Sequence, residues 1–89
     1  MGDCAKALEC YQKALRIHEK TLGIGNLRVA TNYYNIGTVY CIQGKYKKAL
    51  QWMDKALAVR LKILGAEHPD TKSTLKWIDR TKRRLSNEE

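Results

Sequence analysis

The apolar residues of this chain recur at the three- and four-residue spacing of amphipathic helices, with polar residues between them. Glycine-containing breaks divide this pattern into stripes, and the single proline opens the last stripe. Glycine commonly ends helices and proline suits their first turn, so we expect four helices. Their predicted ranges are residues 2–22, 27–43, 45–64 and 69–85, followed by a frayed tail over residues 86–89.

The two halves of the chain resemble each other when the sequence is shifted by 42 residues. Lys13-Ala14-Leu15 then falls on Lys55-Ala56-Leu57, and Leu22-Gly23 falls on Leu64-Gly65. Identities at helical spacing indicate a repeat protein, in which each helix pair packs against the next. We therefore expect residues 1–89 to form one all-α domain.

A run of residues in the middle of the chain resembles the tetratricopeptide pattern Trp-x2-Leu-Gly-x2-Tyr…Ala-x3-Phe. The matching residues are Tyr33, Ile36, Gly37, Tyr40, Ala49, Met53 and Ala56. In addition, the segment from Leu64 to Asp70 is similar to the Leu-Gly-x-x-His-Pro-Asp linker of kinesin-light-chain-type repeats. The resemblance implies a right-handed α-solenoid fragment of four antiparallel helices, in which the small residues let neighbouring helices approach closely.

Counted in such repeats, the chain begins at the second helix of a pair. The apolar stripe of residues 2–22 then lacks a preceding helix to cover it, and the helix that follows can bury only part of it. Exposed apolar faces favour association. We therefore expect a homodimer when this chain is isolated. The residues of this stripe are Ala7, Leu8, Tyr11, Ala14 and Leu15.

The net charge and the cysteine content restrict which kind of partner and which cellular compartment we expect. The net charge is +8, from 17 Lys and Arg against 9 Asp and Glu, which favours an acidic partner. The three cysteines form no Cys-x-x-Cys pair, so we expect reduced thiols, a cytoplasmic chain and no zinc site. No apolar run approaches the roughly 20 residues that a membrane span needs.

We expect neither catalysis nor a cofactor. Ser73-x2-Lys76 matches the start of a serine acyl-enzyme site, but the Ser-Asp-Asn and Lys-Thr-Gly partner motifs are missing. His18-Glu19 lacks the second histidine of a metalloprotease helix. We interpret His68, next to Pro69, as a helix cap rather than a metal ligand.

The predicted helix over residues 69–85 carries a basic stripe at four-residue spacing. Leu75, Ile78 and Leu85 form its predicted buried stripe, and Trp77 lies where the two stripes meet. In tetratricopeptide arrays the first helix of each pair lines a concave groove that binds partners. Carried over to this sequence, the groove residues are Ser73, Lys76, Trp77, Arg80, Arg83 and Arg84, together with Thr31, Tyr34, Asn35, Thr38, Cys41 and Ile42.

These residues predict an interaction module that binds an acidic peptide or helix. Asn35 also matches the asparagine of carboxylate-clamp repeats, but Ser73 and Trp77 stand where that clamp needs lysine and arginine. Two alternatives remain open at this point. The basic stripe from Lys72 to Arg84 would also suit nucleic acid or an anionic surface, with strong salt dependence. It would equally suit the solvated face of a helix that only caps a longer array.

Overall fold

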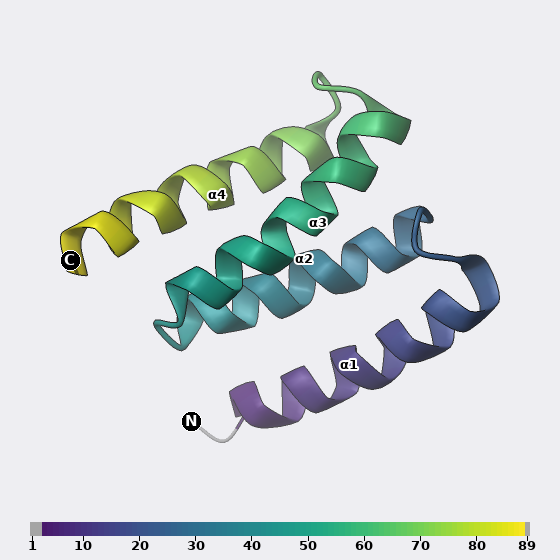
Figure 1. Ribbon diagram of the computed structural model, residues 1–89, viewed down its shortest axis with the longest axis horizontal. Coiled ribbons are helices and arrows are strands. Elements are labelled where there is room, and N and C mark those ends of the chain that lie inside the picture. The colour runs from purple at the N-terminus through teal and green to yellow at the C-terminus, as the bar shows by residue number, and fades with distance from the viewer. Residues whose placement is uncertain (1–2, 89) are drawn as a thin grey trace.

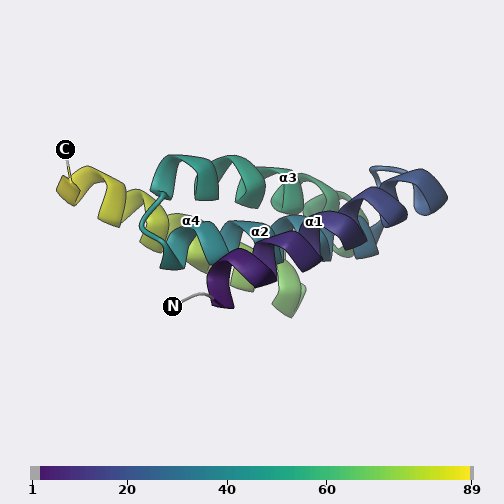
Figure 2. The same cartoon turned by 90° about the horizontal axis from the view of Figure 1, so that it is seen from below.

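The computed structural model describes residues 3–88, which form four helices. Consecutive helices run antiparallel and follow one another across the molecule, as Figure 1 shows. Seen from below in Figure 2, α3 lies above α2 and α4. The predicted all-α fold of four helices is therefore confirmed. The bounds are Asp3–Leu22 for α1, Leu27–Ile42 for α2, Tyr46–Leu64 for α3 and Pro69–Glu88 for α4.

The two long linkers end and restart the helices in the same way. Gly23 and Gly65 have φ angles of 84° and 86°, which lie in the left-handed region that residues with a Cβ rarely adopt. Three residues later, Asn26 and His68 each accept a backbone N–H bond at the start of the next helix. The His68 Nδ1 accepts from the Asp70 N–H at 3.0 Å, which confirms its predicted capping role.

Three predicted helix ends differ from the structure. The helix predicted over residues 27–43 ends at Ile42, and the one predicted over 45–64 begins at Tyr46. The turn between them therefore spans residues 43–45, which is longer than the single residue that the prediction left, and Gly44 adopts a φ of 79° within it. The tail predicted to fray is helical as far as Glu88, since no glycine or proline interrupts a helix that gains one hydrogen bond per added residue. Gly2 and Glu89, included in the predictions, lie outside the described residues.

The core lies mainly between α2 and α3. Ala49 and Ala56 of α3 are fully buried, and the Gly37 backbone lies against Ala49 and Met53. Tyr33 of α2 packs beside Trp52 of α3, with 5.8 Å between ring centroids. Small residues thus bring the two backbones together and larger ones fill the space beside them, as the repeat pattern predicts.

The apolar stripe of α1 is covered in part by α2. Leu15 is buried, and Leu8 and Tyr11 pack against the same cluster as Val29 and Ile36. As expected, α2 covers only part of the stripe, because Leu15 is buried while Leu8 and Tyr11 stay half-buried. The small residues of α1, Ala7 and Ala14, remain half-buried, whereas their repeat equivalents Ala49 and Ala56 are fully buried.

The buried side of α4 consists mostly of threonine. Ile78 is buried as predicted, Leu85 is half-buried, and Leu75 is 43% exposed, so its predicted burial is wrong. Leu75 is the repeat equivalent of Tyr33, which is covered by the helix that follows it, and among the described residues no helix follows α4. The fully buried positions of α4 are Thr71, Thr74 and Thr81.

Candidate functional site

The candidate site lies where α2 and α4 come together on the side away from α3. Two side-chain contacts join these helices. The Tyr34 hydroxyl and the Ser73 hydroxyl lie 3.1 Å apart, and the Cys41 sulfur lies 3.5 Å from the Thr81 hydroxyl. Residues almost forty positions apart in sequence are therefore brought into direct contact, as the predicted groove requires.

A hollow of about 210 Å³ opens between the C-terminal parts of these two helices. Ile42 projects into solvent at its edge, while Cys41 is buried in its wall. Half-buried Trp77 provides the other apolar surface. Arg80 and Arg84 are exposed, so the hollow joins an apolar surface to two guanidinium groups. The residues lining it are Cys41, Ile42, Trp77, Arg80 and Arg84.

Ion pairs engage part of the basic stripe. Arg83 pairs with Asp79 at 3.2 Å, and Lys72 pairs with Glu67 at 3.3 Å. Lys76, Arg80 and Arg84 form no ion pair with any side chain that the structure describes. Within this stripe, the cations without an ion pair therefore form the row that borders the hollow.

The other predicted groove residues lie outside the hollow. Thr38 donates to the Tyr34 carbonyl at 2.8 Å within its own helix, and Asn35 is half-buried. Lys76 is exposed one turn before the hollow, and Arg83 is held by Asp79. The structure thus assembles Trp77, Arg80 and Arg84 with α2, and it places the remaining predicted residues around them.

Arg60 of α3 is a contributor that the sequence analysis missed. Its side chain is buried, its Nη1 donates to the Thr74 hydroxyl at 2.9 Å, and its guanidinium carbon lies 4.5 Å from the Tyr34 ring centroid. This stacking supports the tyrosine that contacts Ser73. The available signal was its position four residues after Ala56, on the stripe that already contains Met53.

Residues 3–88 were also considered as a source of metal ligands and of a membrane span, and they supply neither. No group of three or more His, Cys, Asp or Glu side chains in this range could hold a metal ion. Among the same residues, no helix is both long enough and apolar enough to pass through a bilayer.

Antiparallel helix pairs that repeat along the chain and pack each against the next define a helical repeat protein of the solenoid class. The sequence matches the tetratricopeptide repeat profile over residues 1–62 and again over residues 28–76. The chain belongs to the tetratricopeptide repeat family, whose repeats generally mediate protein–protein interaction. The finer resemblance to kinesin-light-chain-type repeats stays a prediction.

Curated relatives carry the same similarity. Tetratricopeptide repeat protein 23-like from Mus musculus is 31% identical over 77 residues, which is 78% of this chain and 17% of the relative. The clustered mitochondria protein homolog of Aspergillus niger is 32% identical over 69 residues, 78% of this chain and 6% of the relative. The clustered mitochondria protein homolog of Danio rerio is 32% identical over 71 residues, which is 79% of this chain and 5% of the relative. The chain therefore spans less than a fifth of the length of these relatives.

Proposed function

We propose that this chain is a non-catalytic, cytoplasmic interaction module that binds an acidic segment of a protein partner between α2 and α4. The observation that carries the proposal is the hollow in which Trp77 and Ile42 meet Arg80 and Arg84. An apolar side chain of the partner would contact Trp77, and neighbouring carboxylates would bind the arginines. Free thiols at Cys4, Cys10 and Cys41 are compatible with a reducing compartment.

The chemistry of the two arginines favours a carboxylate partner. A guanidinium presents several N–H donors in a rigid fork, which matches the two oxygens of a carboxylate. Lys76 continues the same row and adds attraction that is felt over about a Debye length, ~8 Å at physiological salt. Phosphate groups of nucleic acid would also bind such a row. The apolar half of the hollow favours a peptide, because a nucleic-acid backbone offers no aliphatic side chain to fill it.

Charge reversal of Lys76 and Arg80 to Glu tests the proposal. The probe is a fluorescein-labelled peptide rich in Glu and Leu, and fluorescence anisotropy measures its Kd. We expect at least about tenfold weaker binding, because each position changes from attraction to repulsion. The matched control reverses Lys47 and Lys82, which are exposed, line none of the hollows described and change the net charge equally. Equal effects of the two double variants would refute a localised groove.

A second variant separates the peptide proposal from its rival. Trp77→Ala is expected to weaken the peptide while leaving a labelled double-stranded oligonucleotide unaffected, since the bases of a duplex stack on one another and the duplex would bind through its phosphates. Far-UV circular dichroism checks that helicity is retained. Equal loss of both probes would favour a general anionic surface. If neither probe binds the unsubstituted chain, we would conclude that α4 only caps a longer array with a solvated basic face.

We also propose that the isolated chain forms a homodimer through the small-residue side of α1. Ala7 and Ala14 supply this face, and their repeat equivalents in α3 are fully covered by a neighbouring helix. Exposed Cys10 lies between them and adds no charge. Two such faces could approach about a two-fold axis without bringing the basic rows of the two copies together.

A further inference from the structure

A second surface lies on the opposite side of the array from the groove. It is formed by the end of α1, the linker to α2 and the end of α3. Its three isoleucines are unusually open to solvent: Ile24 is 69% exposed, Ile17 63% and Ile63 50%. Large apolar side chains that gather on a charged surface mark interaction sites. We call this surface the outer face.

The outer face is hollowed on both sides of Ile24. One hollow, broad and open, has a volume of about 650 Å³ and lies along α1. The other has a volume of about 310 Å³ and lies against α3, where Ala58, Val59 and Ile63 line it. Both include Ile24, so they form neighbouring depressions separated by one side chain. Such a surface has room for two apolar side chains of one ligand.

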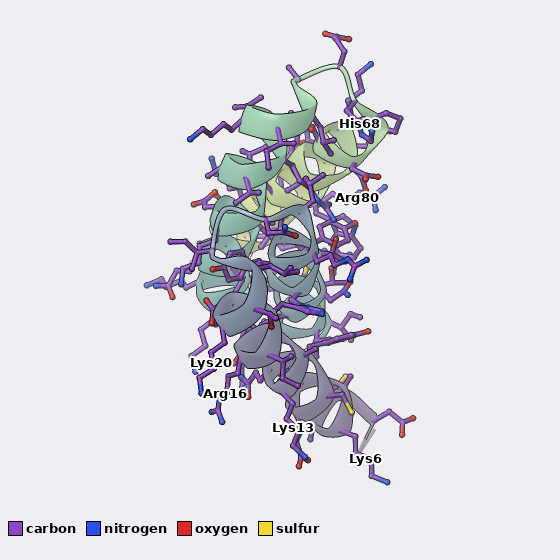
Figure 3. The ribbon with its side chains drawn as sticks, turned by 90° about the vertical axis from the view of Figure 1, so that its right-hand side faces the viewer. Lys6, Lys13, Arg16, Lys20, His68 and Arg80 are labelled. Carbon is purple, nitrogen blue, oxygen red and sulfur yellow. The ribbon has the colours of Figure 1, made fainter. Side chains whose placement is uncertain are left out.

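Positive charge surrounds these hollows. Arg16 and Lys20 line the larger hollow and Lys62 the smaller one. Glu19 is the acidic residue among those lining them, and its carboxylate already accepts a bond from the Tyr33 hydroxyl at 3.2 Å. In Figure 3, Arg16 and Lys20 project on one side of the molecule and Arg80 on the other. The outer face and the groove are therefore separate basic surfaces.

We propose that the outer face binds an acidic amphipathic helix of a partner protein. Two apolar side chains of that helix occupy the hollows beside Ile24, and its carboxylates bind Arg16, Lys20 and Lys62. Charge complementarity selects this occupant over a second copy that binds through the same face, because Arg16, Lys20 and Lys62 of the two copies would then lie against one another. The depressions beside Ile24 favour the inserted side chains of a helix, and a lipid surface, which the exposed Ile17 and Ile24 would also contact, is tested below.

This proposal goes beyond the groove and does not depend on it. Because the two surfaces lie on opposite sides of the same helices, two partners could be bound at once. The chain would then link an acidic segment in the groove to an acidic helix on the outer face. Failure of either site leaves the other intact, so the experiments below are made in a background in which the groove is disabled.

The test uses the 89-residue chain carrying Lys76→Glu and Arg80→Glu. The probe is a labelled synthetic helix with leucines on one face and glutamates on the other, and the comparison peptide has the same composition in scrambled order. Ile24→Ser is expected to weaken the amphipathic peptide at least about tenfold, because an isoleucine loses its contacts in both hollows. Because Ile24 is 69% exposed, the variant is expected to remain folded, and circular dichroism verifies the helicity.

Two matched substitutions act as controls. Ile42→Ser changes an isoleucine of 66% exposure at the groove, and Leu75→Ser changes an exposed leucine that lines none of the hollows described. Both are expected to leave peptide affinity within about twofold. Amide chemical shifts of the unsubstituted chain should change around Ile24 and Ile63 when the peptide is added. A full loss with Ile24→Ser and none with the controls supports the proposal.

Four results would overturn it. If Ile24→Ser binds the amphipathic peptide as tightly as the parent, the hollows are not part of the interface. If the scrambled peptide binds equally well, the surface recognises negative charge and not an amphipathic helix. Stronger binding to vesicles of phosphatidylcholine and phosphatidylserine in equal amounts assigns the face to a membrane. If Ile24→Ser instead lowers only the sedimentation coefficient of the chain alone, the occupant is a second copy.

Discussion

Gly37 marks the closest approach of α2 and α3, and replacing it with alanine tests the packing on which both candidate surfaces depend. A Cβ added at this position would lie 3.0 Å from the Met53 Cγ and 3.2 Å from the Ala49 carbonyl oxygen. The methionine side chain can yield, whereas the carbonyl belongs to the α3 backbone. Relief of the second contact therefore requires the two helices to move apart.

The expected magnitude is a balance of two effects. Alanine is favoured over glycine inside a helix by about 0.8–1.0 kcal/mol. Overpacking of a well-packed core costs about 1–3 kcal/mol. The net change for Gly37→Ala is then a destabilisation of up to about 2 kcal/mol, and each kcal/mol lowers Tm by roughly 4–8 °C in a domain of this size. Urea and thermal unfolding followed by circular dichroism measure it.

A control and a double variant make the result specific. Gly25→Ala meets no atom within 4 Å, so it is expected to be neutral or slightly stabilising. Combining Gly37→Ala with Met53→Ala removes the methionine contacts, and the two changes should cost less together than the sum of their separate costs. An increase in stability for Gly37→Ala alone, of the size that helix propensity gives, would refute the close approach of α2 and α3.

Two further predictions concern pH and assembly. Burial raises the pKa of Tyr33 above its ordinary value, and the hydrogen bond and charge of Glu19 raise it further. The protonated Tyr33 side chain therefore stabilises the folded chain fully below about pH 10. This contribution to the free energy of unfolding is lost as the pH rises through the folded-state pKa. The free energy of unfolding of Tyr33→Phe should therefore fall less than that of the parent between about pH 9 and pH 11. An equal fall in both proteins across that range would contradict this. Sedimentation at micromolar concentration in physiological salt should give a dimer that Ala14→Glu converts to a folded monomer, and a parent chain that sediments as a monomer would remove the proposed α1 interface.

Much of the fold follows from local sequence signals. Gly23 and Gly65 end helices because their φ angles exclude most other residues, and Asn26 and His68 cap the next helices at equivalent repeat positions. The burial of Ala49 agrees with its place in the tetratricopeptide pattern, where a small residue lets neighbouring helices approach closely. Each of these features depends on a few neighbouring residues, so a single stretch of sequence contains the information. The row of cations on α4 could likewise be predicted from the four-residue spacing within one stretch of sequence.

The features that were missed depend on how distant segments meet. Thr74 and Thr81 are polar by type, yet both are buried, because each hydroxyl donates to the carbonyl four residues earlier and so keeps a partner. Judged by residue type alone, the apolar Leu75 was therefore expected to be buried in place of these threonines. The outer face combines Ile24 of a linker with Ile63 of α3, and only the packed chain shows that they share one hollow.

The same repeat position carries a polar contact in both helix pairs, and this explains how the groove keeps its shape. His18 Nδ1 lies 2.7 Å from the Asn32 amide nitrogen between α1 and α2, and the equivalent residues Arg60 and Thr74 form a 2.9 Å bond between α3 and α4. Only the second pair involves a side chain long enough to reach across to α2, where it stacks on Tyr34. Arg60 thereby connects three helices. Its guanidinium therefore joins α3 to both helices that border the groove, next to the contact between Tyr34 and Ser73.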